Sequence, residues 1–175
     1  MHQYSLLKKT IEFNHLAEQV SIYNMALGRE VGCQPFATHN TRDASGDGFI
    51  DTGRSGVANE VMVLVQTIDN WWKEEAFPMV DVVKIDTEGA ELWVLEGAVE
   101  FLSACKPIIY LEIWPVNLLL YPYKAQDIIL WLNKHGYGLC TLTGSAVTPV
   151  NISAYLGVHE TFVAMFDDKL LGVVQ

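Results

Sequence analysis

Residues 80–91 constrain the fold more than any other part of this chain. The run VDVVKI at 80–85 is rich in β-branched residues, which predicts a strand buried on both faces. An acidic turn with Asp86, Glu88 and Gly89 follows, and leucine and valine then recur at helical spacing up to residue 102. Ligands of open α/β sheets bind at the carboxyl ends of strands. We therefore expect Asp86 and Glu88 to lie at such an edge.

Structural roles for these acids remain open beside a functional one. Asp86 can serve as the N-cap of the following helix. Glu88 and Glu91 are expected in its first turn, where carboxylates face the positive end of the helix dipole.

The rest of the sequence alternates between helical and strand patterns. Helices are predicted over 5–14, 68–73, 91–105 and 125–135, and strands over 20–27, 60–65, 80–85, 108–114, 137–142 and 160–166. Loops are predicted over 29–59, 115–123 and 143–157, with Thr67 or Asp69 capping the helix at 68–73. This order predicts a single α/β domain over residues 1–175. Its sheet is expected to be mostly parallel and to close with an antiparallel strand.

Charge and cysteine content exclude several classes of function. The formal net charge is −10 and basic residues form no run longer than Lys8-Lys9, which disfavours binding to nucleic acid or to an anionic membrane. No apolar run is long enough to span a bilayer. The three cysteines lie far apart without Cys-x-x-Cys spacing, so we expect reduced thiols in a cytoplasmic protein and no zinc site.

Residues 82–98, VVKIDTEGAELWVLEGA, resemble the signature of the FkbM-type S-adenosylmethionine-dependent methyltransferases. The flanking segments 6–28, 66–69 and 107–112 are similar to the family as well. The resemblance implies a class I methyltransferase fold with a Rossmann-like sheet. It also implies O-methylation of a hydroxyl on a sugar, a polyketide or another small metabolite.

The resemblance assigns the acids a role in proton transfer. Asp86 is the first choice for the group that takes the proton of the acceptor hydroxyl, Glu88 the next, and Glu112 joins them from the neighbouring strand tip. Carboxylates that share a cleft repel, so one of them is expected to have a raised pKa. Sharing a divalent metal is the alternative, although no metal ligand is assigned. His159 is a weaker candidate.

The sequence departs from the family in the cofactor-binding segment. The family's Asp-x-Gly-x-x-x-Gly turn after the first strand and its acid after the second are not found in this chain. We therefore expect an amino-terminally truncated domain that lacks the first two strands of the sheet. For S-adenosylmethionine, the resemblance leaves Asn24, Met25 and Ala26 beside the adenine, together with Asp86.

The missing strands have a consequence for packing. In the class I fold the first strand lies beside the strand at 80–85, whose edge is then unpaired. An open edge favours pairing with another chain, so a homo-oligomer or a piece of a longer protein is expected. Two alternatives remain: an inactive fragment that acts only as an interaction partner, and a metal-dependent hydrolase that uses the same carboxylates. Trp114, Tyr121 and Tyr123 are candidates for stacking on the acceptor.

Overall fold

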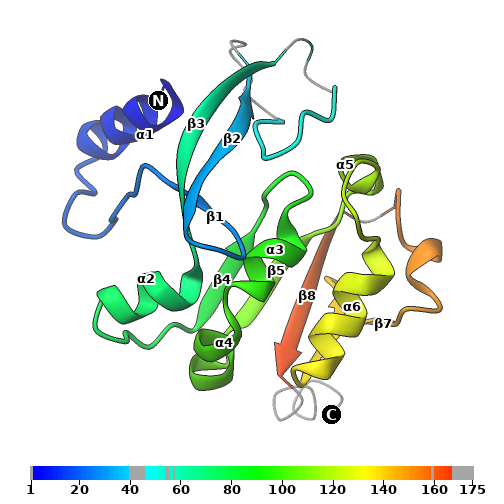
Figure 1. Ribbon diagram of the computed structural model, residues 1–175. Coiled ribbons are helices and arrows are strands. Elements are labelled where there is room, and N and C mark those ends of the chain that lie inside the picture. Colours follow the sequence, from blue (N-terminus) through cyan, green and yellow to red (C-terminus); the bar gives the residue numbers. More distant parts are fainter. Residues whose placement is uncertain (1, 40–45, 54–55, 57, 159, 167–175) are drawn as a thin grey trace.

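The computed structural model describes residues 2–39, 46–53, 56, 58–158 and 160–166, which form an α/β fold with two mixed β-sheets (Figure 1). The elements in chain order are α1 (His2–Phe13), β1 (Ala26–Leu27), β2 (Gly32–Thr38), β3 (Asn59–Gln66), α2 (Ile68–Glu74), β4 (Val82–Ile85), α3 (Glu91–Glu96), α4 (Val99–Cys105), β5 (Ile108–Glu112), α5 (Pro115–Leu118), α6 (Ala125–Lys134), β6 (Tyr137–Thr141), β7 (Ala146–Val147), the 3-10 helix η1 (Ile152–Ala154) and β8 (Thr161–Phe166). Within these residues, no helix has the length and apolar character that crossing a membrane requires.

The larger sheet has the strand order β4-β5-β8-β6-β7. β4 and β5 run parallel, and Ile85 is paired with Leu111, so both strands end at the same edge of the sheet. β8 is antiparallel to β5 and β6, which confirms the predicted antiparallel last strand. Because β8 lies between β5 and β6, β4 and β5 are the one parallel pair of neighbours among the described strands of this sheet. The sheet is therefore mixed, and the prediction that it is mostly parallel is wrong.

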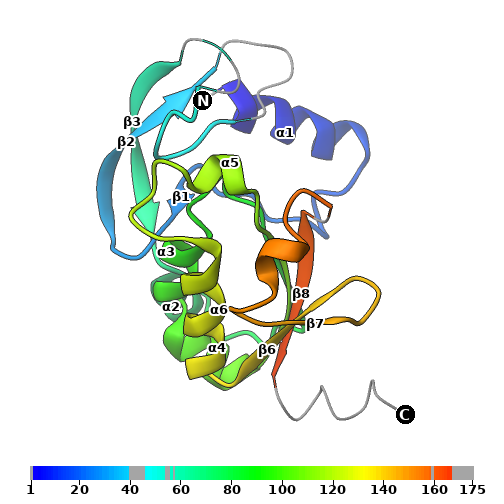
Figure 2. The same cartoon turned by 90° about the vertical axis from the view of Figure 1, so that its right-hand side faces the viewer.

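Helices cover one face of the larger sheet. α3, α4 and α6 lie on the same side of its strands (Figure 2), and the core between them contains Leu95, Phe101, Ile109 and Phe162, all almost fully buried. Burial of each such side chain contributes roughly 1.5–3 kcal/mol to folding. On β4, by contrast, Val82 is 53% exposed and Lys84 is exposed. The prediction that this strand is buried on both faces is therefore wrong, because Val82 and Lys84 share one face of β4 and both are exposed.

The smaller sheet has the order β1-β3-β2 and corrects two predictions. The predicted strand at 20–27 is reduced to Ala26–Leu27, which pairs in parallel with the end of β3. The predicted loop at 29–59 contains the seven-residue strand β2, which is antiparallel to β3. Gly32 and Pro35 concealed this strand, because Pro is tolerated in a sheet mainly on an edge strand, which β2 is.

A glycine contact joins the helices of the larger sheet to the end of β1 in the smaller sheet. The helix predicted at 91–105 is broken into α3 and α4, with Gly97 between them. A Cβ atom on Gly97 would lie 2.2 Å from the carbonyl oxygen of Gly28, which follows β1. The carboxylate of Asp69, in α2, accepts hydrogen bonds from the backbone at the start of α4, including that of Phe101 at 2.8 Å. α2 itself is capped as predicted, since the Thr67 side chain accepts a hydrogen bond from the backbone of the next turn.

Candidate functional site

Two carboxyl groups meet at the carboxyl edge of the larger sheet. Asp86 follows β4 directly and Glu112 is the last residue of β5, so the parallel register places them side by side, as predicted. The Lys84 ammonium group forms an ion pair with the exposed Asp86 carboxylate. Asp86 is not the helix N-cap: α3 begins at Glu91, and its N-cap Ala90 makes no side-chain hydrogen bond.

The environment of Glu112 shifts this carboxyl group toward its protonated form. Burial raises its pKa most, followed by a hydrogen bond with Asp86 and by the negative charges of Asp86, Glu88 and Glu91. Together these effects raise the pKa from 4.5 to about 7. A raised pKa is what carboxylates crowded at one sheet edge are expected to show. The site therefore holds a carboxyl group that exchanges its proton near neutral pH.

Glu91 holds the acidic turn in place. Its side chain is 2% exposed, and Oε1 accepts hydrogen bonds from the backbone of Thr87 at 3.1 Å, the Thr87 hydroxyl at 3.2 Å and the backbone of Gly89 at 3.0 Å. Burial raises the pKa of Glu91, while these hydrogen bonds oppose the rise. This carboxylate thus supports the turn that carries Glu88 and does not itself face solvent.

The turn has an unusual backbone. Glu88 has φ of 54° and Gly89 has φ of 104°. Glu88 lies in the turn ahead of α3, so the prediction that it belongs to the first turn of this helix is wrong. A Cβ atom on Gly89 would lie 2.4 Å from the Tyr121 ring, and the Tyr123 hydroxyl donates a hydrogen bond to the Gly89 carbonyl. Both tyrosines are buried against this turn, and burial, followed by the charge of Glu91, raises their pKa values.

Asn117, in α5, is a site residue that the sequence reasoning missed. Its Nδ2 donates a hydrogen bond of 2.7 Å to Oε2 of Glu88. The signal that was present is a single polar residue in the otherwise apolar run PVNLLLY at 115–121. A lone buried amide in an apolar segment requires a partner, and here that partner is a carboxylate of the acidic turn.

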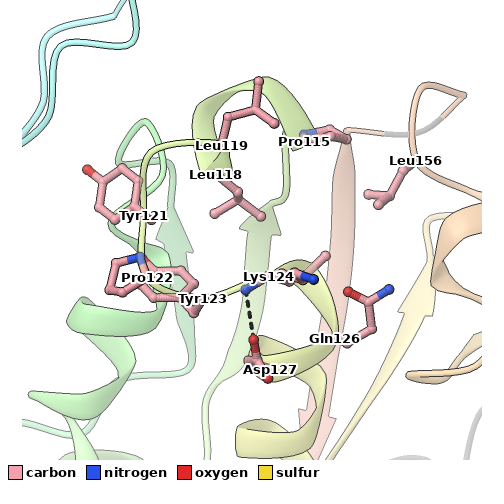
Figure 3. A pocket seen from close by; sticks show the side chains of 11 residues that line it. Pro115, Leu118, Leu119, Tyr121, Pro122, Tyr123, Lys124, Gln126, Asp127 and Leu156 are labelled. Atoms are coloured by element: carbon pink, nitrogen blue, oxygen red, sulfur yellow. Dashed lines mark hydrogen bonds between the residues drawn. The ribbon is translucent and has the colours of Figure 1, made fainter.

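A cavity of about 540 Å³ lies next to this turn, between α5, the start of α6 and Leu156 (Figure 3). Its wall is largely apolar, and Lys124, Gln126 and Asp127 add polar groups. The volume lies within the range of small-molecule sites. Tyr121 and Tyr123 belong both to this wall and to the packing around Gly89, whereas Asp86, Glu88 and Glu112 do not line it. Trp114, the third stacking candidate, is the N-cap of α5.

The residues predicted to contact adenine lie in another part of the structure. Asn24 and Met25 are exposed just before β1, and of the three only Ala26 belongs to the smaller sheet. The carboxylates, by contrast, lie at the ends of strands of the larger sheet (Figure 1). Across the described residues, no group of three or more His, Cys, Asp and Glu side chains is arranged to hold a metal ion. His159 lies outside the described residues.

Trp93, in α3, connects the two regions. Its ring contacts Phe49, from the segment between β2 and β3, at a centroid distance of 5.9 Å, and Tyr121 at 5.0 Å. The Arg29 guanidinium, which follows β1, lies 5.1 Å from the same ring. A single indole thus packs against the segment between β2 and β3 and against Tyr121, which contacts the acidic turn.

Comparison with known proteins identifies the family. Residues 3–139 match the family model described as the methyltransferase FkbM domain. Among solved structures, the crystal structure of methyltransferase FkbM from Methylobacillus flagellatus KT matches with 14% sequence identity and a TM-score of 0.48. That match covers 93% of this chain and 32% of the other, so the chain spans about a third of that protein's length. No curated protein matches. Because the family model covers more than half of the residues, the chain belongs to the FkbM methyltransferase domain family.

Proposed function

We propose that this chain carries the acceptor side of an S-adenosylmethionine-dependent O-methyltransferase that acts on a hydroxyl of a sugar, a polyketide or another small metabolite. Family membership supports a methyltransferase. The observation that carries the proposal is the carboxyl pair of Asp86 and Glu112 at the tips of two parallel strands, in which Glu112 has a pKa of about 7. The order β4-β5-β8-β6, with a reversed strand between two strands of equal direction, supports a partial class I methyltransferase sheet.

The carboxyl pair suits the removal of a proton from an alcohol. A general base is most effective when its pKa lies near the operating pH. Asp86 is ion-paired with Lys84 and is exposed, so it is the member of the pair that can meet an acceptor hydroxyl. Glu112 shares a hydrogen bond with Asp86 and gives up its own proton near pH 7. Above that pH the pair carries two negative charges and accepts the hydroxyl proton more readily.

We assign part of the cofactor site to the described residues. S-adenosylmethionine, when bound, supplies a methyl group activated by a positively charged sulfonium. The carboxylates of Asp86 and Glu88 complement such a positive charge. Asn24 and Met25 are exposed beside β1 and available to an adenine ring, with Ala26 next to them. These are the cofactor contacts that we assign to the described residues.

Replacement of Asp86 tests the proposal. Methyl transfer from isotopically labelled S-adenosylmethionine to a panel of small alcohols and sugars is measured for the wild type and for Asp86→Asn. Loss of a general base is expected to lower the rate by about 10²–10⁴-fold. The matched control is Asp81→Asn, which removes an exposed aspartate just ahead of β4 and is expected to leave the rate unchanged.

Two results contradict the proposal in different ways. Unchanged turnover in Asp86→Asn removes this residue from the mechanism. If the wild-type chain transfers no methyl group and calorimetry detects no binding of S-adenosylhomocysteine, the alternative of an inactive fragment replaces the enzyme.

A further inference from the structure

We propose that Asn117 is a positioning residue, which holds the Glu88 carboxylate within the acidic cluster. This role deepens the proposed function and rests on it, because it concerns the same carboxylates.

The geometry fixes both partners of this contact. Asn117 is 2% exposed, and its Nδ2 donates a hydrogen bond of 2.7 Å to Oε2 of Glu88. Its backbone nitrogen bonds to the Trp114 carbonyl at 3.1 Å, which fixes the short helix α5. The backbone carbonyl oxygen of Asn117 lies only 2.9 Å from the point where a Cβ atom on Gly89 would be. Thus α5 is in direct contact with the turn, and the amide has little freedom to move.

The orientation of the amide follows from the chemistry of its partner. An ionised carboxylate only accepts hydrogen bonds, so the nitrogen of Asn117 has to face Glu88. The oxygen Oδ1 then points elsewhere, and within the described part of the chain it is buried without a hydrogen-bond partner. A buried acceptor without a donor costs free energy that a leucine of similar size would not cost. Packing alone therefore gives no reason for an asparagine here, whereas control of Glu88 does.

Glu88 needs such control. It is a non-glycine residue with a positive φ of 54°, in a turn that places it next to the other acids. Its negative charge is among those that raise the pKa of Glu112, after burial and the contributions of Asp86. Loss of the Asn117 bond removes one restraint on the partly exposed Glu88 side chain, so its charge spends more time in solvent, where it is screened.

The test follows the protonation of Glu112 by carbon-13 NMR of its carboxyl group. We expect Glu88→Gln, which removes the charge, to lower the midpoint of the Glu112 titration by on the order of 0.5 pH unit, and Asn117→Leu, which removes one restraint on that charge, to lower the midpoint by a measurable amount that is no larger. The double variant is expected to shift it no further than Glu88→Gln alone. Asn133→Leu, at an exposed position of α6, is the matched control and should leave the midpoint unchanged.

A second measurement needs no change at Asn117. The side-chain amide signals of Asn117 in the wild-type protein should move when Glu88 takes up a proton, and this movement should vanish in Glu88→Gln. The proposal is overturned if those signals do not respond to Glu88. It is also overturned if Asn117→Leu leaves the Glu112 midpoint unchanged, or if Glu88→Gln does. Neither NMR measurement requires cofactor or acceptor. A negative result for the role of Asn117 can therefore be told apart from a negative result for methyl transfer.

Discussion

Gly89→Ala is expected to lower the free energy of unfolding by about 2–5 kcal/mol. An L side chain at the φ of 104° found here costs roughly 1–2 kcal/mol in backbone strain. The added Cβ would also lie 2.4 Å from Cε2 of Tyr121 and 2.9 Å from the carbonyl oxygen of Asn117. Tyr121 is only 6% exposed, so its ring cannot retreat without disturbing its neighbours, and such overpacking costs about 1–3 kcal/mol. This loss is a large part of the free energy of unfolding of a typical domain, which is roughly 5–15 kcal/mol.

Urea unfolding followed by circular dichroism measures this loss, and Gly144→Ala separates its two parts. Gly144 has a φ of 86° as well, but nothing lies within 4 Å of a Cβ atom built on it. That variant should therefore show only the backbone cost of roughly 1–2 kcal/mol. If both variants lose the same free energy, the contact of Gly89 with Tyr121 and Asn117 does not restrict the turn, and the reasoning is refuted.

Three further predictions concern the acid pair, a helix cap and the sheet edge. The folded-state pKa of Glu112 is raised from 4.5 to about 7, so protonation of this carboxyl group contributes to the free energy of unfolding. That contribution is fully present below pH 4.5 and is lost as the pH rises through 7. Glu112→Gln should therefore flatten the fall in the free energy of unfolding across that window, and an unchanged slope in denaturant titrations would contradict this. Thr67→Ala should cost about 0.5–2 kcal/mol, because Thr67 Oγ1 accepts a hydrogen bond from the Asn70 backbone at 3.1 Å; Thr67→Ser should keep most of the stability in thermal melts. We propose that the chain self-associates along β4, which is an edge strand of the described part of the sheet, so Val82→Lys should shift the wild-type oligomer toward monomer in analytical ultracentrifugation, and a wild-type monomer rules this out.

Local signals in the sequence were sufficient where an element depends on its own residues. The β-branched run at 80–85 does contain β4, and Thr67 does cap α2. Asp86 and Glu112 were predicted to meet because parallel strands end at a common edge, which needs only the direction of two strands. The antiparallel direction of β8 was predicted correctly as well.

Prediction failed where distant segments decide the structure. The run at 20–27 has the composition of a strand, but only Ala26 and Leu27 pair with β3, and the residues before them have no strand structure. The break at Gly97 reflects a contact with Gly28, which lies far earlier in the chain. Helical periodicity contains no information about such a contact. The partners of the acidic turn, Asn117 and Tyr123, act through side-chain bonds that span 29 and 34 residues. No local pattern predicts such contacts.

The position of Trp93 has a practical consequence. Because its indole packs on Phe49 on one side and on Tyr121 on another, any ligand that displaces either neighbour alters the polarity around the indole. Its fluorescence is then an intrinsic probe that reports a ligand bound against Phe49 or Tyr121 without a label. A Trp93→Phe variant supplies the blank, so that the emission of the remaining tryptophans can be subtracted.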